Sequence, residues 1–171
     1  MFARSALVGE VAPTLRSDPI PEGDNGEVDS VTVVVGATFE RVVLDSRADV
    51  LLCVYREGDR AWSALKGEYG RLARKLRAMD PHGRLVIARL EQDNNEAAAL
   101  AVLASTPALL LFPAGERQPV TYPSGAPRDV RSLVIWVQMN AATGFAKDRR
   151  ERQRGGNMPG QIAHREKFDE L

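Results

Sequence analysis

The middle of the chain alternates between continuous apolar runs and segments in which apolar residues recur every three or four positions. Continuous runs are typical of strands that are covered on both faces of a sheet. They occur at Asp49–Tyr55, Leu85–Leu90 and Ala108–Phe112. Shorter runs rich in β-branched residues predict two further strands, at Val31–Val35 and Pro119–Tyr122.

A long helix is predicted after the first buried run. Its apolar face is formed by residues spaced three and four positions apart, namely Trp62, Leu65, Tyr69, Leu72, Leu76 and Met79. Asp59 lies just before this stripe as a natural N-cap, because its carboxylate accepts hydrogen bonds from free backbone N–H groups. Further helices are predicted around Phe39, over the alanine- and leucine-rich segment Asn95–Ala104, and over Asp129–Asn140.

The predicted order of elements is β-α-β-α-β-α-β-β-α, which indicates an α/β layered domain. This is the order of the thioredoxin fold, a central mixed sheet with helices on both faces. Four segments follow from composition. Residues 1–15 carry a helical apolar stripe, and residues 16–30 contain prolines, glycines and acidic residues, as expected of a linker. Residues 31–140 form the folded domain, and residues 141–171 form a charged tail that we expect to be disordered.

Charge and cysteine content exclude several classes of function. Basic and acidic residues are equal in number, at 23 each, so net charge does not favour nucleic acid or acidic lipid as a partner. No apolar run approaches the roughly 20 residues needed to span a bilayer. Cys53 is the only cysteine, so the chain has neither a CxxC motif nor an internal disulfide. His82 and His164 lie far apart in sequence, and we expect no metal site and no cofactor.

Several stretches resemble the last thioredoxin domain of protein disulfide isomerases, in which it is the C-terminal catalytic domain. They are Arg16–Glu22 with Val31–Phe39, the strand Asp49–Tyr55, and Thr106–Pro107 with the strand that follows. The chain also ends in Phe168, Asp169, Glu170 and Leu171, a variant of the KDEL retrieval signal. The resemblance therefore implies an endoplasmic reticulum protein with a retrieval receptor as one partner.

The resemblance also shows what this chain lacks. The family carries a Trp-Cys-Gly-His-Cys motif at the start of the long helix, where the helix N-terminus activates the first thiolate. Counted without gaps, Asp59 and Trp62 stand at the positions of the two cysteines. Cys53 stands where the family has a buried glutamate, and mid-strand it is expected to be an inert apolar residue. Arg128 matches a family arginine, although an exposed arginine there is also ordinary surface.

A peptide-binding groove is implied by the same resemblance. The family has a cis proline at the position of Pro107, and the backbone of the preceding residue, here Thr106, pairs with extended substrate. An exposed aromatic ring at Trp62 would suit contact with a peptide. The alternative for Trp62 is that its ring packs against the neighbouring loop.

Two functions of different kinds remain open at this stage, and the sequence does not decide whether the chain is an enzyme. The first is a redox-inactive thioredoxin domain that binds unfolded chains or partner proteins. The second is the C-terminal part of an active isomerase whose CxxC lies upstream, since residues 1–15 resemble the last helix of a preceding domain. A decayed gene copy is a weaker third reading. In the tail, a basic cluster at Arg149, Arg150, Arg152 and Arg154 is read as solvated spacer, with nucleic acid or lipid binding as the alternative.

Overall fold

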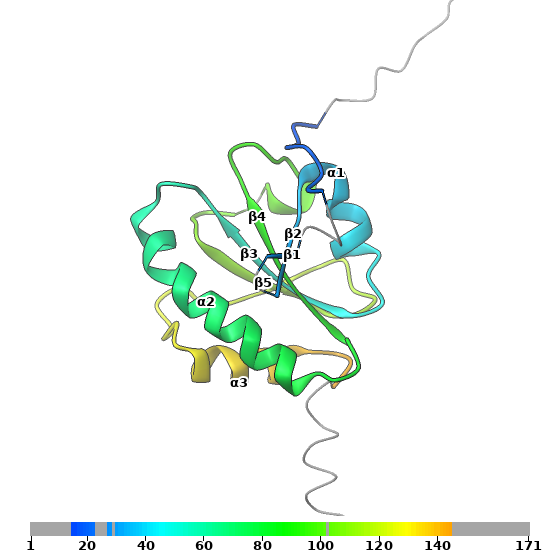
Figure 1. Cartoon of the computed structure of the whole chain (residues 1–171), viewed down its shortest axis with the longest axis vertical. Helices are drawn as coiled ribbons and strands as arrows, with labels where there is room; N and C mark the ends of the chain where they lie inside the picture. Colours follow the sequence, from blue (N-terminus) through cyan, green and yellow to red (C-terminus); the bar gives the residue numbers. More distant parts are fainter. Residues whose placement is uncertain (1–14, 23–26, 29, 102, 145–171) are drawn as a thin grey trace, which may run out of the picture.

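The computed structural model describes residues 15–22, 27–28, 30–101 and 103–144. Their centre is a six-stranded mixed sheet in the order β1-β2-β4-β3-β5-β6 (Figure 1). The strands are β1 (Glu27–Val28), β2 (Val31–Val33), β3 (Asp49–Tyr55), β4 (Leu85–Glu91), β5 (Ala108–Phe112) and β6 (Val120–Thr121).

β3 lies at the centre of the sheet, as its continuous apolar run predicts. It pairs in parallel with β4 and antiparallel with β5, and all seven of its residues are buried. Successive side chains of a strand point to opposite faces. Accordingly Leu51 and Cys53 join the core on one face, and Val50 and Leu52 join the core on the other.

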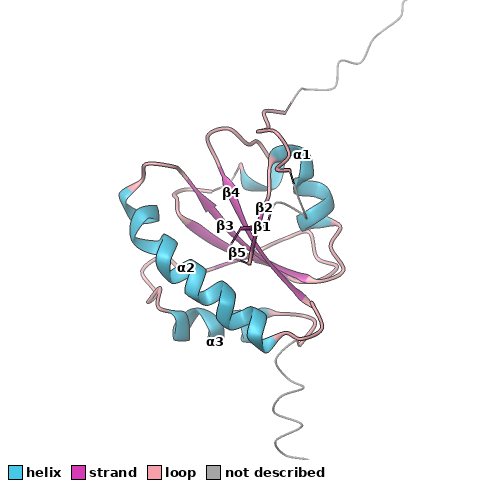
Figure 2. Cartoon of the chain, viewed as in Figure 1, coloured by secondary structure: helices cyan, strands magenta, loops and turns pink. Residues whose placement is uncertain are grey.

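Helices cover both faces of the sheet (Figure 2). On one face lie α2 (Arg60–Met79) and α3 (Val130–Asn140), which pack against each other and against the core that contains Cys53. On the other face lie α1 (Gly36–Phe39) and the π-helical turn η1 (Glu40–Leu44), which supply Phe39 and Val43 to the second core. The predicted thioredoxin-type arrangement is confirmed.

One predicted helix is largely missing. Among the described residues between Asn95 and Ala104 the structure has only a short 3₁₀ turn, η2 (Ala98–Leu100). Ala97, the residue before the turn, is extended (φ −143°, ψ 128°). The side chain of Asn95 is buried and hydrogen-bonded to three other segments, and this holds the start of the region in a non-helical conformation. Helix propensity is overridden here by tertiary contacts.

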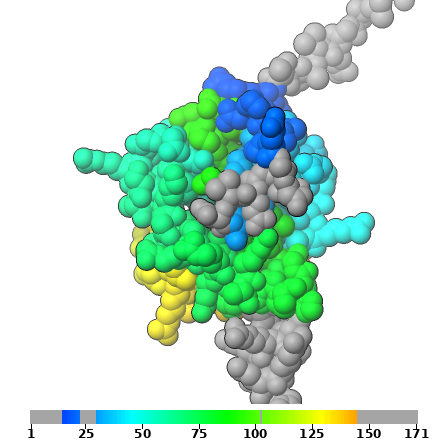
Figure 3. All heavy atoms as spheres, viewed as in Figure 1, coloured from blue at the N-terminus to red at the C-terminus, as the bar shows by residue number. Residues whose placement is uncertain are grey.

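Residues 16–30, predicted as a linker, are part of the domain wherever the structure describes them. Their C-terminal part contributes β1, which pairs antiparallel with β2. Their N-terminal part is hydrogen-bonded to the loop after β4, because Asn95 Oδ1 accepts from the backbone N–H of both Asp18 and Gly36. Figure 3 shows this segment, in blue, lying against the rest of the domain.

The domain also extends slightly beyond its predicted C-terminal boundary at residue 140. The carboxylate of Asp49 is completely buried at the start of β3. It accepts hydrogen bonds from the backbone N–H groups of Ala114, Ala142 and Thr143, at 2.9, 2.9 and 3.0 Å. This buried acceptor ties the end of the described chain to the central strand.

Candidate functional site at the start of the long helix

The turn between β3 and α2 lies where a disulfide isomerase carries its reactive cysteines. Asp59 caps the helix as predicted, since its Oδ1 accepts a hydrogen bond from the backbone N–H of Ala61 at 2.9 Å. Its backbone carbonyl accepts from the hydroxyl of Ser63 at 3.0 Å. Gly58 allows the tight turn with φ of +83°, a conformation that residues with a side chain rarely adopt. The carboxylate therefore serves the helix start.

Trp62 is buried, which decides between the exposed and the packed ring that the sequence left open. Only 2% of the residue is exposed. Its ring stacks on that of Tyr55, with centroids 4.1 Å apart and planes inclined by 23°. The physical reason is its place in the helix, because Trp62 begins the apolar stripe that continues through Leu65 and Tyr69 into the core. Nor does it rest simply on a loop, since its stacking partner is the last residue of β3.

Cys53 is buried, as predicted from its position in the middle of an apolar run. The side chain is completely buried, and burial raises the pKa of the thiol to about 12. The guanidinium groups of Arg128 and Arg89 act in the opposite direction but do not offset the burial. A thiol with this pKa carries almost no thiolate at neutral pH, and the thiolate is the reactive species.

Arg89 is a neighbour of Cys53 that the sequence reasoning missed. The two residues are register partners on β4 and β3. The Nε of Arg89 is buried and has no hydrogen-bond partner among the described residues. The sequence signal for Arg89 was its position as the one charged residue in the apolar run Leu85–Leu90. Tyr55, the other unrecognised residue, was visible as the aromatic end of β3.

Thr106 and Pro107 lie at the same end of the sheet as the start of α2. The peptide bond between them is cis, as the resemblance implies. Pro107 is buried and Thr106 is partly exposed. Because Ala108 at the start of β5 pairs with Val54, these two residues lie beside the end of β3 that carries Tyr55 and the stacked Trp62. The structure thus brings Thr106, Pro107 and Trp62 together, with the tryptophan ring directed inward.

Arg128 lies on the other side of the helix start. With Ala61, Ala64, Leu65 and Glu68 it lines a shallow hollow of about 380 Å³ beside the first turns of α2. Its guanidinium group lowers the pKa of the Cys53 thiol, although burial has the larger, opposite effect. Arg128 is therefore close enough to act electrostatically on the position of Cys53, where the resemblance places a glutamate in the family. The lining of the hollow combines apolar side chains with two charged ones, Glu68 and Arg128.

Other classes of site find no support in the described part of the chain. It contains no cluster of histidine, cysteine or acidic side chains able to hold a metal ion. Among its helices, none is long and apolar enough to cross a bilayer. The predicted N-terminal helix before Leu15 and the retrieval signal Phe168–Leu171 lie outside the described residues.

Comparisons with known proteins agree with this geometry, although no family model matches the chain. It is 37% identical over 123 residues to protein disulfide isomerase-like 1-4 of Arabidopsis thaliana, covering 71% of this chain and 19% of the relative. It is 33% identical over 140 residues to the protein disulfide-isomerase of Humicola insolens, covering 81% and 26%. The chain thus spans about a quarter or less of the length of these relatives.

A solved structure extends the comparison to the fold. The first thioredoxin domain of mouse protein disulfide-isomerase A4 superposes with a TM-score of 0.54 and 19% identity, over 78% of this chain and 86% of that domain. The sheet order, the helices on both faces and the site beside Thr106–Pro107 define a thioredoxin-fold domain. The sequence identities go one step further: the chain is a homologue of the protein disulfide isomerases.

Proposed function

We propose that this chain is a redox-inactive thioredoxin domain that assists protein folding by binding extended segments of unfolded or partner polypeptides. The observation that carries the proposal is the state of the two cysteine positions. Asp59 caps the helix and Trp62 is buried against Tyr55, so neither position offers a nucleophile. The remaining thiol, Cys53, is buried with a raised pKa. Thiol–disulfide exchange needs an accessible thiolate.

The binding edge we propose is formed by Thr106 and Pro107. Thr106 is partly exposed next to the end of β3, so its backbone is accessible to a segment that aligns beside it. Main-chain pairing of this kind gives affinity with little dependence on client sequence. The apolar hollow beside Arg128 offers a second contact for an apolar client side chain. Trp62 contributes to this edge by fixing the position of Tyr55.

The location we propose is the lumen of the endoplasmic reticulum. Its support is the homology to protein disulfide isomerases together with the terminal residues Phe168–Leu171, which resemble a retrieval signal read by a receptor. Neither nucleic acid nor a membrane is a partner in this proposal, because basic and acidic residues balance.

The test separates binding from catalysis. A reduced and carboxymethylated protein, which stays unfolded and has no thiol, is titrated into the isotopically labelled chain and followed by NMR. We expect shifts of the backbone signals of Thr106 and Ala108, and none at Met139, which is 79% exposed on α3. In parallel, the chain is assayed for reduction of insulin disulfides, and no activity is expected. Shifts confined to other surfaces, or measurable reduction, would contradict the proposal.

A second candidate function is favoured by the short coverage of the relatives, 19% and 26% of their lengths. In this alternative the chain is one domain of a larger isomerase whose CxxC lies upstream. An antibody raised against residues 147–171 measures the size of the endogenous protein. A band near 18.7 kDa favours the free-standing domain, and a band several times larger favours the multidomain isomerase.

A further inference from the structure

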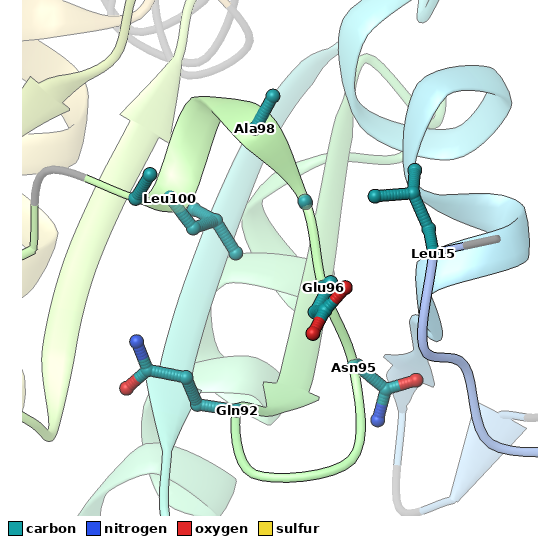
Figure 4. Close-up of a pocket in the computed structure, with 8 residues that line it drawn as sticks. Leu15, Gln92, Asn95, Glu96, Ala98 and Leu100 are labelled. Atoms are coloured by element: carbon teal, nitrogen blue, oxygen red, sulfur yellow. The ribbon is translucent and has the colours of Figure 1, made fainter. Parts of the chain in front are cut away.

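A second hollow lies on the opposite side of the sheet from Arg128, next to the point where the described chain begins. It has a volume of about 310 Å³ (Figure 4). Its lining residues are Leu15, Gln92, Asn95, Glu96, Ala97, Ala98, Leu100 and Ala101. In Figure 4 the side chain of Leu15 approaches the hollow from one side and the η2 turn from the other.

The η2 turn forms part of the wall of the hollow. Alanine side chains project from this turn, and Ala98 and Ala101 are exposed. Leu100 is buried beneath them and joins the core that contains Phe39. Small side chains above a buried leucine leave a depression whose floor is apolar, while its rim carries the polar groups of Gln92 and Glu96.

Hydrogen bonds of Arg16 fix the chain beside this hollow. The backbone N–H of Glu96 donates to the carbonyl of Arg16 at 2.8 Å, and the backbone N–H of Arg16 donates to the Glu96 carboxylate at 3.2 Å. The Arg16 guanidinium also donates to the carbonyl of Asp93 at 3.0 Å. These bonds hold Leu15 at the rim, yet 53% of Leu15 is exposed.

We propose that the hollow is the docking site of this chain's own N-terminal segment, through Leu7, Val8 and Val11. These residues continue the apolar stripe that ends at Leu15, at spacings of three and four. Val11 precedes Leu15 by four positions, and a chain extends at most about 3.6 Å per residue, so the tether from Leu15 allows Val11 to reach no further than roughly 14 Å, which includes the hollow beside Leu15.

The short tether favours this occupant over a separate molecule. Joining two groups by a short linker raises their effective concentration to the millimolar range. A partner in solution competes poorly with an apolar segment that is tethered to Arg16, which hydrogen bonds fix at the rim. The proposal does not rest on the proposed function, because neither Thr106 nor Asp59 is among the residues that line the hollow.

The test uses engineered cysteines in the full chain, in which Cys53 is buried and does not interfere. The pair Val11→Cys with Ala98→Cys places one thiol in the segment and one at the hollow. The matched control is Val11→Cys with Ala37→Cys. Ala37 is also exposed and lies beside the same anchored segment, because its N–H donates to the hydroxyl of Ser17 at 2.9 Å. Oxidation is followed on non-reducing gels.

We expect the pair at residue 98 to cross-link within one chain at least about tenfold faster than the control, a ratio equivalent to ~1.4 kcal/mol. Adding Leu7→Ser and Val8→Ser should bring the two rates together. Equal cross-linking rates for the two cysteine pairs without the serine substitutions would mean that the N-terminal segment has no preference for the hollow. That result would overturn the proposal. Cross-linked dimers in place of monomers would assign the hollow to a second copy of the chain. As an independent readout, amide exchange at Ala98 and Ala101 should speed up in the Leu7→Ser/Val8→Ser variant of the otherwise unmodified chain.

Discussion

The ring of Trp62 lies against the ring of Tyr55 with centroids 4.1 Å apart, and this stack occupies the position that the family resemblance assigns to the second reactive cysteine. Tyr55 ends β3 and Trp62 lies in the first turn of α2, so the stack joins the central strand to the long helix. A large buried aromatic pair contributes apolar burial as well as a favourable ring geometry. By the resemblance, this position carries a reactive cysteine in the family, and here it carries the buried side chain of Trp62.

Removing the Trp62 ring should therefore destabilise the domain strongly. For Trp62→Ala we expect a loss of roughly 3–5 kcal/mol in the free energy of unfolding, measured by urea denaturation, because a large buried side chain leaves a cavity. Trp62→Phe should cost clearly less, since it keeps a ring beside Tyr55. The matched control is Met139→Ala, at a residue 79% exposed, for which a change within about 0.5 kcal/mol is expected. A similar loss for both alanine variants would refute this account of Trp62.

Restoring the motif tests whether the scaffold still supports redox chemistry. Asp59 and Trp62 have the spacing of a CxxC motif, so Asp59→Cys with Trp62→Cys rebuilds it at the N-terminus of α2. Because Trp62→Cys removes the same ring as Trp62→Ala, the double variant should lose a similar amount of stability and is assayed under conditions in which it is folded. We expect the folded double variant to form an internal disulfide and to reduce insulin, with the thiol at position 59 titrating below about 7.5. The single variant Asp59→Cys is the control and should form no internal disulfide, because Cys53 is buried. Activity of the unmodified chain equal to that of the double variant would contradict the proposed function.

Substitution by alanine is expected to change the free energy of unfolding in opposite directions at Gly36 and Gly67. A Cβ on Gly36 would lie 2.7 Å from the carbonyl oxygen of Arg16 and 3.1 Å from that of Glu96, so Gly36→Ala should displace the anchored N-terminal segment. We expect a loss of at least about 1 kcal/mol, of the size seen when close packing is strained. The amide of Glu96, which donates to Arg16, should exchange faster.

Gly67 supplies the matched control. It lies inside α2, and a Cβ there would meet nothing within 4 Å. Gly67→Ala should raise the free energy of unfolding by about 0.5–1 kcal/mol through helix propensity and chain entropy. If both glycine variants gained stability, the contact of Gly36 with the N-terminal segment would not constrain the domain.

The buried thiol predicts a defined dependence of stability on pH. Burial raises the pKa of Cys53 from 9.0 to about 12, so the unfolded chain loses this proton at lower pH than the folded chain does. The corresponding stability is fully present below pH 9 and is lost as the pH rises toward 12, by up to ~1.4 kcal/mol per pH unit. Cys53→Ala should flatten this part of the curve, measured by urea denaturation at pH 8 and pH 10.5.

Tyrosines also titrate in this range, and burial raises the pKa values of Tyr55 and Tyr69 as well. The informative quantity is therefore the difference between the unmodified chain and the Cys53→Ala variant, which share these tyrosines. An identical pH slope for both proteins would show that Cys53 is accessible or already ionised. Labelling by a thiol reagent at pH 8 should likewise require unfolding.

The sequence by itself determined the strands and the helix whose buried residues recur at regular spacings along the chain. The apolar run Asp49–Tyr55 predicted the central strand to the residue, and the run Ala108–Phe112 did the same for its antiparallel neighbour. The stripe that begins at Trp62 predicted α2, and Asp59 predicted its start. These predictions are confirmed because the periodicity of a strand or a helix is visible in the pattern of apolar residues within a short stretch of sequence. The stripe also carried the correct signal for Trp62, whose exposure the family resemblance had left open.

Only the tertiary structure decided the segments whose conformation depends on distant partners. Asn95 receives the N–H of Asp18, 77 positions earlier, and this contact both prevents the predicted helix and anchors the supposed linker. Asp49 likewise reaches Thr143, 94 positions later, and extends the domain past its expected end. Such hydrogen bonds leave no periodic trace in the sequence, because a buried polar group is satisfied by whichever segment the fold brings beside it. Composition alone, through the single cysteine, had already determined that this chain carries no CxxC of its own.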